Sequence, residues 1–302
     1  MNMLSRRKFL AAGAALPFIL RAAEKPALHL GLVADPQYAD ADPIATRFYR
    51  QSIGKLTEAV EHFNSQELDF CVNVGDTIDH KWQSFDEMLR IFGKSKRKFY
   101  HLLGNHDFEV APEEKAKAPG RLGLEKKYYS VTQNGFCFVM LDTNDISVYA
   151  YPVNSKEFVQ AFEVLKAYAA TGVIHAQTWN GAVGAEQMKW FEETCKKAAS
   201  ANQKVIAFAH HPIFPFPHNR NEWNSDALLQ LIDRNRNVVA WINGHNHDGN
   251  YRERDGAHYL TLHGMVETQN TNSFATAQIF ADRILIAGKG REPSRELKFR
   301  TA

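Results

Sequence analysis

Short apolar runs alternate with amphipathic stretches over the first third of the chain. Residues 28–34, 70–74 and 99–103 are apolar runs bounded by polar clusters, and this pattern predicts three buried β-strands. Residues 46–63 and 85–92 carry apolar side chains at helical spacing, which predicts a helix after each of the first two strands. The order β-α-β-α-β is typical of a parallel sheet, whose strands end at one edge.

The rest of the chain predicts a second group of strands and helices. An Asn134-Gly135 dipeptide between the runs 128–132 and 136–141 predicts a hairpin, which follows a polar surface loop at 111–127. Two further helices are expected at 157–169 and 184–199. Five further strands are expected at 205–209, 238–242, 259–262, 274–280 and 284–287.

The composition is that of one globular domain with an apolar core. The chain has 302 residues, of which 44% are hydrophobic and 23% charged, and no linker-like stretch follows residue 26. We therefore expect a single α/β domain over residues 27–302, built as a four-layer α/β/β/α sandwich. The cysteines are scattered through predicted strands and a helix, which predicts buried thiols without a disulfide: Cys71, Cys137 and Cys195.

The first 23 residues have the pattern of a twin-arginine export signal. The basic segment Ser5-Arg6-Arg7-Lys8-Phe9-Leu10 precedes an apolar stretch at 11–20, which is shorter than the roughly 20 residues needed to span a bilayer. We therefore expect export by the twin-arginine machinery to the periplasm or another extracytoplasmic location, with no stable membrane span. Because no Ala-x-Ala triplet follows the apolar stretch and Arg21 lies near the cleavage region, retention as an anchor stays an alternative.

The charge of the exported chain gives no reason to expect nucleic-acid binding. The formal net charge of the whole sequence is +2, and loss of residues 1–23 would remove four basic residues and no acidic one, leaving −2. A protein this close to neutral lacks the strong positive field that attracts nucleic acids. The expected partner is therefore a small molecule.

Polar clusters follow the ends of the predicted strands. They combine carboxylates, amides and imidazoles in this order: Asp35-Pro36-Gln37, Gly75-Asp76, Gly104-Asn105-His106-Asp107, His210-His211-Pro212 and Gly244-His245-Asn246-His247-Asp248. Ligands gather outside the carboxyl ends of strands in open α/β sheets, so the clusters are expected to meet. This mixture of oxygen and nitrogen donors suits two divalent metal ions, and a pair of metals sharing one ligand is typical of phosphorus-ester hydrolysis.

The order Asp-x-Gln, Gly-Asp, Gly-Asn-His-Asp, His-His-Pro and Gly-His-x-His resembles that of the calcineurin-like metallophosphoesterases. The resemblance implies the metallo-dependent phosphatase fold. It assigns the first metal to Asp35, Gln37 and His247, and it makes Asp76 the ligand that bridges both metals. The residues implied for the second metal are Asn105, His210 and His245. The resemblance also makes His106 the catalytic residue, which would stabilise charge or protonate the leaving oxygen while a metal-bridging hydroxide attacks phosphorus.

Gln37 departs from the commoner family pattern, which has histidine at this position. An amide oxygen is a weaker donor than imidazole for late first-row metals, so Mn²⁺ is expected to be favoured, with Fe or Zn²⁺ as alternatives. The competing interpretation makes Gln37 a non-ligand beside a one-metal site. Asp107 is expected to orient His106 or a metal ligand, or else to cap the following turn. His211 is expected to be structural or substrate-facing, because adjacent residues on an extended chain point opposite ways.

Further motifs resemble one subfamily, the manganese-dependent ADP-ribose/CDP-alcohol diphosphatases. They are spread along the chain after Leu28: Ala34-Asp35-Pro36-Gln37-Tyr38-Ala39-Asp40, Arg47-Phe48-Tyr49-Arg50, Gly75-Asp76-Thr77-Ile78-Asp79, Asn180-Gly181, Glu186-Gln187-Met188-Lys189-Trp190, Glu267-Thr268 and Gly288-Lys289-Gly290-Arg291. The resemblance implies hydrolysis of a nucleoside diphosphate linked to a sugar or an alcohol, such as ADP-ribose or CDP-choline. The loop between Asp40 and Thr46 is shorter than in the subfamily, where a longer segment contributes to nucleotide recognition.

The substrate stays open at this point. The alternative is a broad-specificity exported phosphodiesterase or phosphomonoesterase with the same metal site. A scaffold protein that lost catalysis is disfavoured, because every ligand position is filled and His106 is present. Aromatic residues near the predicted site loops could stack on a base: Tyr38, Trp82, Trp179 and Tyr251. Basic residues that could bind a phosphate dianion are Arg47, Arg50 and Arg252.

Overall fold

The computed structural model describes residues 24–216 and 218–300, and the expected signal segment at 1–23 lies outside the described residues. The first three strands form where the sequence predicts them: β1 (Leu28–Val33), β2 (Phe70–Asn73) and β3 (Phe99–His101). β1 pairs in parallel with β2, and β2 pairs in parallel with β3. The connecting helices are α1 (Ser52–Asn64) and α2 (Ser84–Phe92).

The described strands form two sheets of six strands each. The first sheet has the order β12-β11-β10-β1-β2-β3. Its antiparallel part consists of β10 (Ser273–Ile279), β11 (Arg283–Gly290) and β12 (Arg295–Lys298). The second sheet has the order β4-β5-β6-β7-β9-β8. Its strands are β4 (Tyr129–Gln133), β5 (Phe136–Met140), β6 (Lys204–Phe208), β7 (Val238–Asn243), β8 (Asn250–Arg254) and β9 (Ala257–Thr261).

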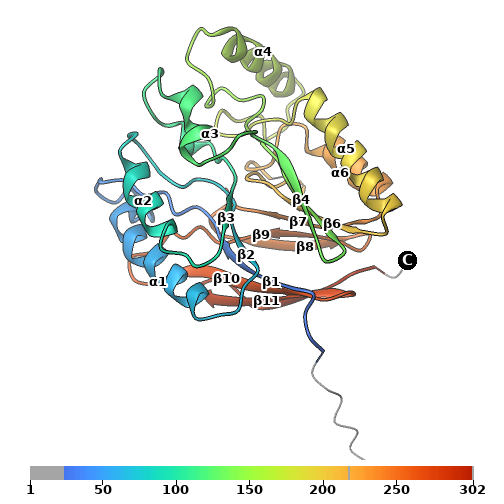
Figure 1. Cartoon of the computed structure of the whole chain (residues 1–302). Coiled ribbons are helices and arrows are strands. Elements are labelled where there is room, and N and C mark those ends of the chain that lie inside the picture. Colours follow the sequence, from blue (N-terminus) through green and yellow to red (C-terminus); the bar gives the residue numbers. More distant parts are fainter. Residues whose placement is uncertain (1–23, 217, 301–302) are drawn as a thin grey trace, which may run out of the picture.

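The two sheets pack face to face and bury an apolar core between them. Phe70 of β2 meets Phe138 of β5 edge to face, with ring centroids 5.1 Å apart. Helices α1 and α2 cover the outer face of the first sheet, whereas α5 (Ala185–Ser200) and α6 (Ser225–Arg234) cover the outer face of the second (Figure 1). The expected four-layer α/β/β/α sandwich is therefore confirmed. The three cysteines are free and buried, as predicted.

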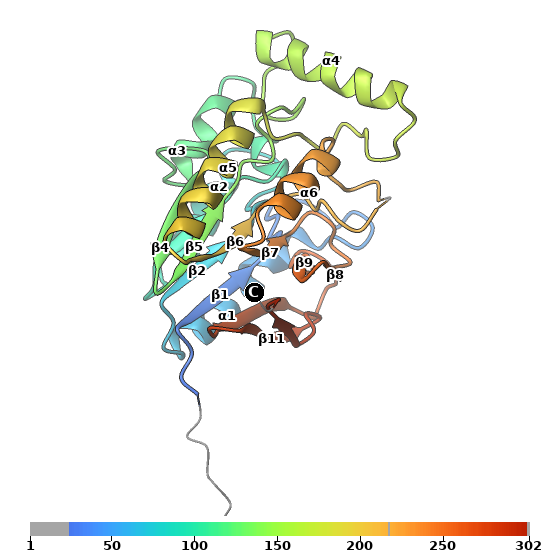
Figure 2. The ribbon, with the colours of Figure 1, turned by 90° about the vertical axis from the view of Figure 1, so that its right-hand side faces the viewer.

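The segment between β5 and β6 carries a helix that stands apart from the two sheets. This helix is α4 (Lys156–Ala170). Ser155 precedes it, and the Ser155 hydroxyl accepts a hydrogen bond from the backbone N–H of Phe158. Ser155 is thus an N-cap of the usual kind. Figure 2 shows α4 at one end of the molecule, beyond the ends of α5 and α6. Within residues 24–216 and 218–300, the helices are too short or too polar to cross a membrane.

Two predicted segments differ from the structure. The helix expected at 46–63 begins only at Ser52, after a short 3-10 helix, η1 (Tyr49–Gln51). Its expected first residues are extended, because Phe48 N–H donates to the carbonyl of Val266 and the backbone of Arg47 pairs with that of Glu267. Tertiary pairing thus overrides the helical pattern.

The loop expected at 111–127 contains two short helices, η3 (Lys115–Lys117) and α3 (Ala118–Arg121). The strands β8 and β12 and the helix α6 were not predicted.

Candidate metal centre

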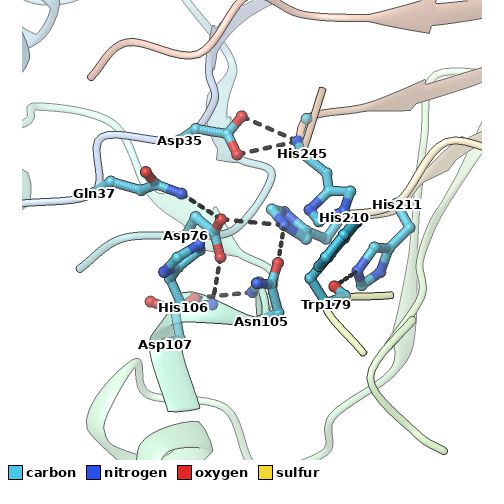
Figure 3. Close-up of polar contacts among 12 residues, drawn as sticks. Asp35, Gln37, Asp76, Asn105, His106, Asp107, Trp179, His210, His211 and His245 are labelled. Carbon is cyan, nitrogen blue, oxygen red and sulfur yellow. Dashed lines mark hydrogen bonds and ion pairs between the residues drawn. The ribbon is translucent and has the colours of Figure 1, made fainter. Parts of the chain in front are cut away.

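The predicted ligand residues meet at the carboxyl ends of five parallel strands. β1, β2 and β3 of the first sheet lead into the loops with Asp35, Asp76 and Asn105. β6 and β7 of the second sheet lead into the loops with the three histidines predicted as ligands, of which Figure 3 labels His210 and His245. Side chains from both sheets therefore gather in one place. Six of the seven predicted ligands are buried, and the side chain of His247 is 9% exposed; the six are Asp35, Gln37, Asp76, Asn105, His210 and His245.

Several of these residues have an uncommon backbone conformation. Asp35, Gln37 and Asp76 have φ angles of 50°, 44° and 51°, and His245 has a φ of 67°. Side-chain-bearing residues rarely adopt this left-handed region, and such conformations cluster at functional sites. Hydrogen bonds hold them here: Asp35 Oδ1 accepts from the backbone N–H of His245 at 3.0 Å. The turns thus aim the side chains of both sheets at one point.

Three of the predicted first-metal ligands offer oxygen and nitrogen atoms within reach of one ion. Asp35, Asp76 and His247 place one donor atom each within 4.8 Å of the others. His247 Nε2 lies 3.5 Å from Asp35 Oδ1. Gln37 Nε2 donates to Asp76 Oδ2 at 2.8 Å, while Gln37 Oε1 is buried without a hydrogen-bond partner among the described residues. A buried acceptor without a donor suits a cation, so the residues present fit a metal ion here.

The predicted second-metal ligands lie on the other side of Asp76. His210 Nε2 is 3.3 Å from Asp76 Oδ2 and 3.1 Å from Asn105 Oδ1. The His245 ring lies next to that of His210, with centroids 5.0 Å apart. Asp76 is thus in contact with residues of both halves, which is the geometry that a bridging carboxylate requires.

Each of the three predicted ligand histidines has one ring nitrogen held from outside the site. His210 Nδ1 lies 3.0 Å from the carbonyl oxygen of Val74, and His247 Nδ1 lies 2.7 Å from Glu267 Oε1. His245 uses the opposite nitrogen, because its Nε2 lies 2.9 Å from Asn180 Oδ1. A neutral imidazole that donates its N–H outward keeps the lone pair of its other nitrogen for a metal.

Asn180 and Glu267 are functional residues that the sequence reasoning missed. Both lie in short motifs that carry the subfamily resemblance, Asn180-Gly181 and Glu267-Thr268. The resemblance gave neither residue a role. Asn180 is 65 residues away from His245 in the chain, and Glu267 is 20 residues away from His247. Spacing along the chain gave no sign of either pair. Their occurrence in these two motifs was the available signal.

His106 lies against Asp76 and Asp79, at the mouth of the site. Its backbone N–H donates to Asp76 Oδ1 at 2.8 Å, and its Nδ1 is 3.2 Å from Asp79 Oδ1. Burial lowers the pKa of His106, but the negative charges of Asp76 and Asp79 outweigh burial and raise the pKa well above its ordinary value. With Nδ1 beside Asp79, Nε2 is the nitrogen that can face a substrate.

Asp107 ties two site loops together. Its Oδ2 accepts from the backbone N–H of Gly104 at 2.9 Å, and its Oδ1 accepts from that of Thr77 at 2.8 Å. These bonds connect the turns that carry Asn105 and Asp76. Among the described residues, no hydrogen bond of the carboxylate reaches His106 or caps the following turn; its bonds instead hold the main chain of the two loops that carry Asn105 and Asp76.

His211 has a structural role, which is one of the two roles expected for it. Its Nδ1 lies 2.8 Å from Thr143 Oγ1, and its Nε2 lies 3.2 Å from the carbonyl oxygen of Trp179. The ring does approach His210 and His245 closely enough for a three-histidine metal group. Its two nitrogens contact Thr143 and the main chain of Trp179 rather than another predicted ligand, so we assign His211 a supporting role.

Of the aromatic and basic candidates from the sequence, Trp179 and Arg47 lie by the site. Trp179 is beside His210 and His211 in Figure 3, and Arg47 Nη1 is 3.9 Å from Asp79 Oδ2. The other aromatic candidates pack elsewhere: Trp82 against Phe85, Tyr251 against His258, and Tyr38 against the core beneath α1 and α2. Arg50 pairs with Asp40 and Asp42, and Arg252 donates to the carbonyl of Tyr251.

The chain is similar to known phosphoesterases over most of its length. Residues 28–249 match the family described as Calcineurin-like phosphoesterase. Two relatives named manganese-dependent ADP-ribose/CDP-alcohol diphosphatase, from Mus musculus and Arabidopsis thaliana, are 28% and 29% identical. Each alignment covers 92% of this chain, with 95% and 99% of the relatives. A solved dimetal phosphatase from Danio rerio has a TM-score of 0.82 at 24% identity, over 91% of this chain and 100% of that one.

The chain belongs to the calcineurin-like phosphoesterase family. Its two packed sheets have the fold of the dimetal phosphatase, which confirms the predicted fold type. It is accordingly a metal-dependent hydrolase of phosphoester or diphosphate bonds. The clustered His and Asp side chains provide the donors for its divalent metal cofactors.

Proposed function

We propose that this protein hydrolyses the diphosphate bond of nucleoside diphosphates linked to a sugar or an alcohol, of the ADP-ribose or CDP-alcohol type. The relatives that cover almost the whole chain are named for this activity. The observation that carries the proposal is the position of Asp76 between two half-sites, 3.3 Å from His210 Nε2 and bonded to Gln37 at 2.8 Å. Two divalent cations held there would supply an activated water for attack on phosphorus.

The proposed cofactor is a pair of Mn²⁺ ions. Asp35, Gln37 and His247 would hold the first ion, and Asp76 would contact both. The proposed residues for the second ion are Asn105, His210 and His245. The donors are carboxylate and amide oxygens with imidazole nitrogens, a set that suits Mn²⁺ and contains no thiolate. The unpaired buried oxygen Oε1 of Gln37 supports its role as a ligand rather than as a bystander.

When bound, a pair of divalent ions supplies an activated water and stabilises the phosphoryl oxygens. The chain itself places the catalytic groups around the reacting phosphorus. Asp79 Oδ1 lies 3.2 Å from Nδ1 of His106, which leaves Nε2 as the nitrogen to face the leaving group. As the water oxygen bonds to phosphorus and the bridging P–O bond breaks, His106 gives its proton to the departing oxygen. The products are a nucleotide and a phosphorylated sugar or alcohol.

A comparison of substrates tests the proposed function. The protein is freed of metal, reloaded with Mn²⁺, and assayed for kcat/KM on ADP-ribose, CDP-choline, bis-p-nitrophenyl phosphate and p-nitrophenyl phosphate. A preference of about a hundredfold for the nucleotides, roughly 2.7 kcal/mol of transition-state discrimination, supports the proposal. Equal rates on the artificial esters would replace it with the broad phosphodiesterase or phosphomonoesterase. Activity that persists after chelation would overturn metal catalysis altogether.

We also propose that the protein is exported through the twin-arginine machinery and acts in the periplasm or another extracytoplasmic space. Arg6-Arg7-Lys8 followed by the apolar stretch at 11–20 supports this proposal. A double substitution, Arg6→Lys with Arg7→Lys, should leave the full-length protein in the cytoplasm of a host with this pathway. A double exchange at two exposed lysines of α5, Lys196→Arg with Lys197→Arg, serves as the control. Export of the Arg6→Lys/Arg7→Lys protein at the normal level would contradict the assignment.

A further inference from the structure

Arg47 is fixed to the first-metal side of the site. Its backbone pairs with that of Glu267, the residue that holds His247. Its side chain is 26% exposed, and its one ion pair among the described residues is a long one, 3.9 Å to Asp79 Oδ2. Asp79 is already shared by His106 and His80, which each lie 3.2 Å from its Oδ1. The Arg47 guanidinium is therefore only partly neutralised.

Arg220 is fixed to the second-metal side in a matching way. It follows Asn219, whose carbonyl oxygen accepts a hydrogen bond from Asn180 Nδ2 at 2.8 Å. Asn180 is the residue that holds His245. The Arg220 guanidinium lies over the Trp179 ring, with Cζ 5.6 Å from the ring centroid. Within residues 24–216 and 218–300, it forms no ion pair and donates no hydrogen bond, although the residue is half-buried.

The two guanidiniums, one beside Asp79 and one over Trp179, are within electrostatic reach of each other and of two predicted ligands. Burial lowers the pKa of Arg220, and the positive charge of Arg47 lowers it further, while Asp35 and Asp76 act in the opposite direction. Arg50 contrasts with both, because it is exposed and bound by two carboxylates at 2.6 and 2.8 Å. Two half-buried guanidiniums with little or no neutralisation of their own form a site for an anion, since arginine recognises phosphate through paired hydrogen bonds.

We propose that Arg47 and Arg220 together bind the phosphoryl group that is not attacked, and that they make the site selective for diphosphates over single phosphodiesters. This inference rests on the proposed function. A diphosphate diester carries one negative charge on each phosphoryl group. The metal centre takes the group that reacts, and the arginines take its neighbour. The Trp179 ring holds the Arg220 guanidinium in place by a cation–π contact. A single phosphodiester has no second phosphoryl group to offer them.

The test compares Arg220→Gln and Arg220→Lys with wild type on two substrates, ADP-ribose and bis-p-nitrophenyl phosphate. We expect Arg220→Gln to reduce the ratio of their kcat/KM values by roughly tenfold to a hundredfold, because a hydrogen bond to a charged group contributes about 1.5–3 kcal/mol. Arg220→Lys should recover part of the loss, since it keeps the charge without the planar fork. Arg252→Gln, at an exposed arginine of β8, is the matched control and should keep the wild-type ratio.

A binding measurement separates recognition from chemistry. The Kd of the Mn²⁺-loaded protein for α,β-methylene-ADP-ribose, which cannot be cleaved at the diphosphate, should rise in Arg220→Gln by a similar factor. Mn²⁺ content measured alongside should not change. If the ratio of the two kcat/KM values in Arg220→Gln equals that of wild type, as it would after equal losses on both substrates, the inference is overturned and the proposed function stays in place. A wild type that cleaves bis-p-nitrophenyl phosphate but not ADP-ribose would overturn both.

Discussion

His247 Nδ1 lies 2.7 Å from Glu267 Oε1. The bond fixes the ring so that Nε2 faces Asp35, at 3.5 Å. The loop with Glu267 is itself held by buried Lys55, whose ammonium donates to the carbonyl oxygens of Met265 and Glu267 at 2.9 and 2.8 Å. A chain of contacts thus runs from α1 to a predicted metal ligand. Such outer partners keep ligands in the orientation and protonation state that a metal needs.

We expect Glu267→Gln to weaken binding of the first ion by roughly 10- to 100-fold, the usual effect of losing such an outer partner. The amide keeps the size of the side chain but removes the charge that favours an N–H at His247 Nδ1. Calorimetric titration of the metal-free protein with Mn²⁺ measures the effect, and Glu253→Gln, at an exposed glutamate of β8, is the control. Two unchanged binding steps would show that Glu267 does not support His247.

Gly104→Ala should abolish metal binding for steric reasons. A Cβ at this position would lie 2.0 Å from Asp76 Oδ1 and 2.2 Å from the Asp76 backbone nitrogen. The proposed bridging carboxylate would therefore have to move. Gly54→Ala is the control: it lies within α1 with no atom within 4 Å of the new methyl group, and it should raise helix stability by up to about 1 kcal/mol. Metal analysis of both purified proteins decides the matter, and a Gly104→Ala protein with full metal content would contradict the geometry.

Asp76→Asn and His106→Ala should both lose activity, but by different routes. Asp76 touches both halves of the centre, so its replacement by a neutral amide should strip metal from the protein. His106 is beside the centre and contributes no ligand atom, so His106→Ala should keep its metal while kcat falls about 10²- to 10⁴-fold. Elemental analysis combined with kinetics on ADP-ribose separates the two. Unchanged metal content in Asp76→Asn would refute its bridging position.

The buried carboxyl group of Asp142 should make stability depend on pH. Burial raises the pKa of Asp142 to about 6 from its ordinary value of 3.8, against the opposing charge of Lys127. The folded protein therefore keeps this proton to a higher pH than the unfolded chain. Protonated Asp142 therefore stabilises the folded protein by on the order of 3 kcal/mol. This contribution is present in full below a pH of about 4 and is lost as the pH rises through about 6.

Asp142→Asn removes this titration and keeps an oxygen for the backbone N–H of Asn144, which donates to Oδ1 at 3.0 Å. The difference in unfolding free energy, variant minus wild type, should therefore increase between pH 4 and pH 7. Urea denaturation across this range measures it, with the exposed Asp282→Asn as control. A difference that stays flat with pH would show that Asp142 is not the group responsible.

Local patterns account for most of the fold that the sequence predicted. The strands β1, β2, β6 and β7 are mainly apolar runs, because both faces of each strand are buried. Such runs can be predicted from the sequence alone. β8 was missed because it is a polar strand at the edge of the described sheet, where it pairs with β9. The start of α1 was placed too early because residues 46–48 pair with a segment more than 200 residues later, and no local signal reports such a contact.

The sequence by itself determined the chemistry of the site. Asp35, Asp76, Asn105 and the histidines could be found because each follows a strand, and parallel strands bring their carboxyl ends to one edge. Only the tertiary structure decided which groups orient them. Asn180 faces His245, and Arg220 lies over Trp179, because loops from distant parts of the chain pack against each other. The pairing of such side chains depends on three-dimensional packing, which leaves no periodic pattern in the sequence.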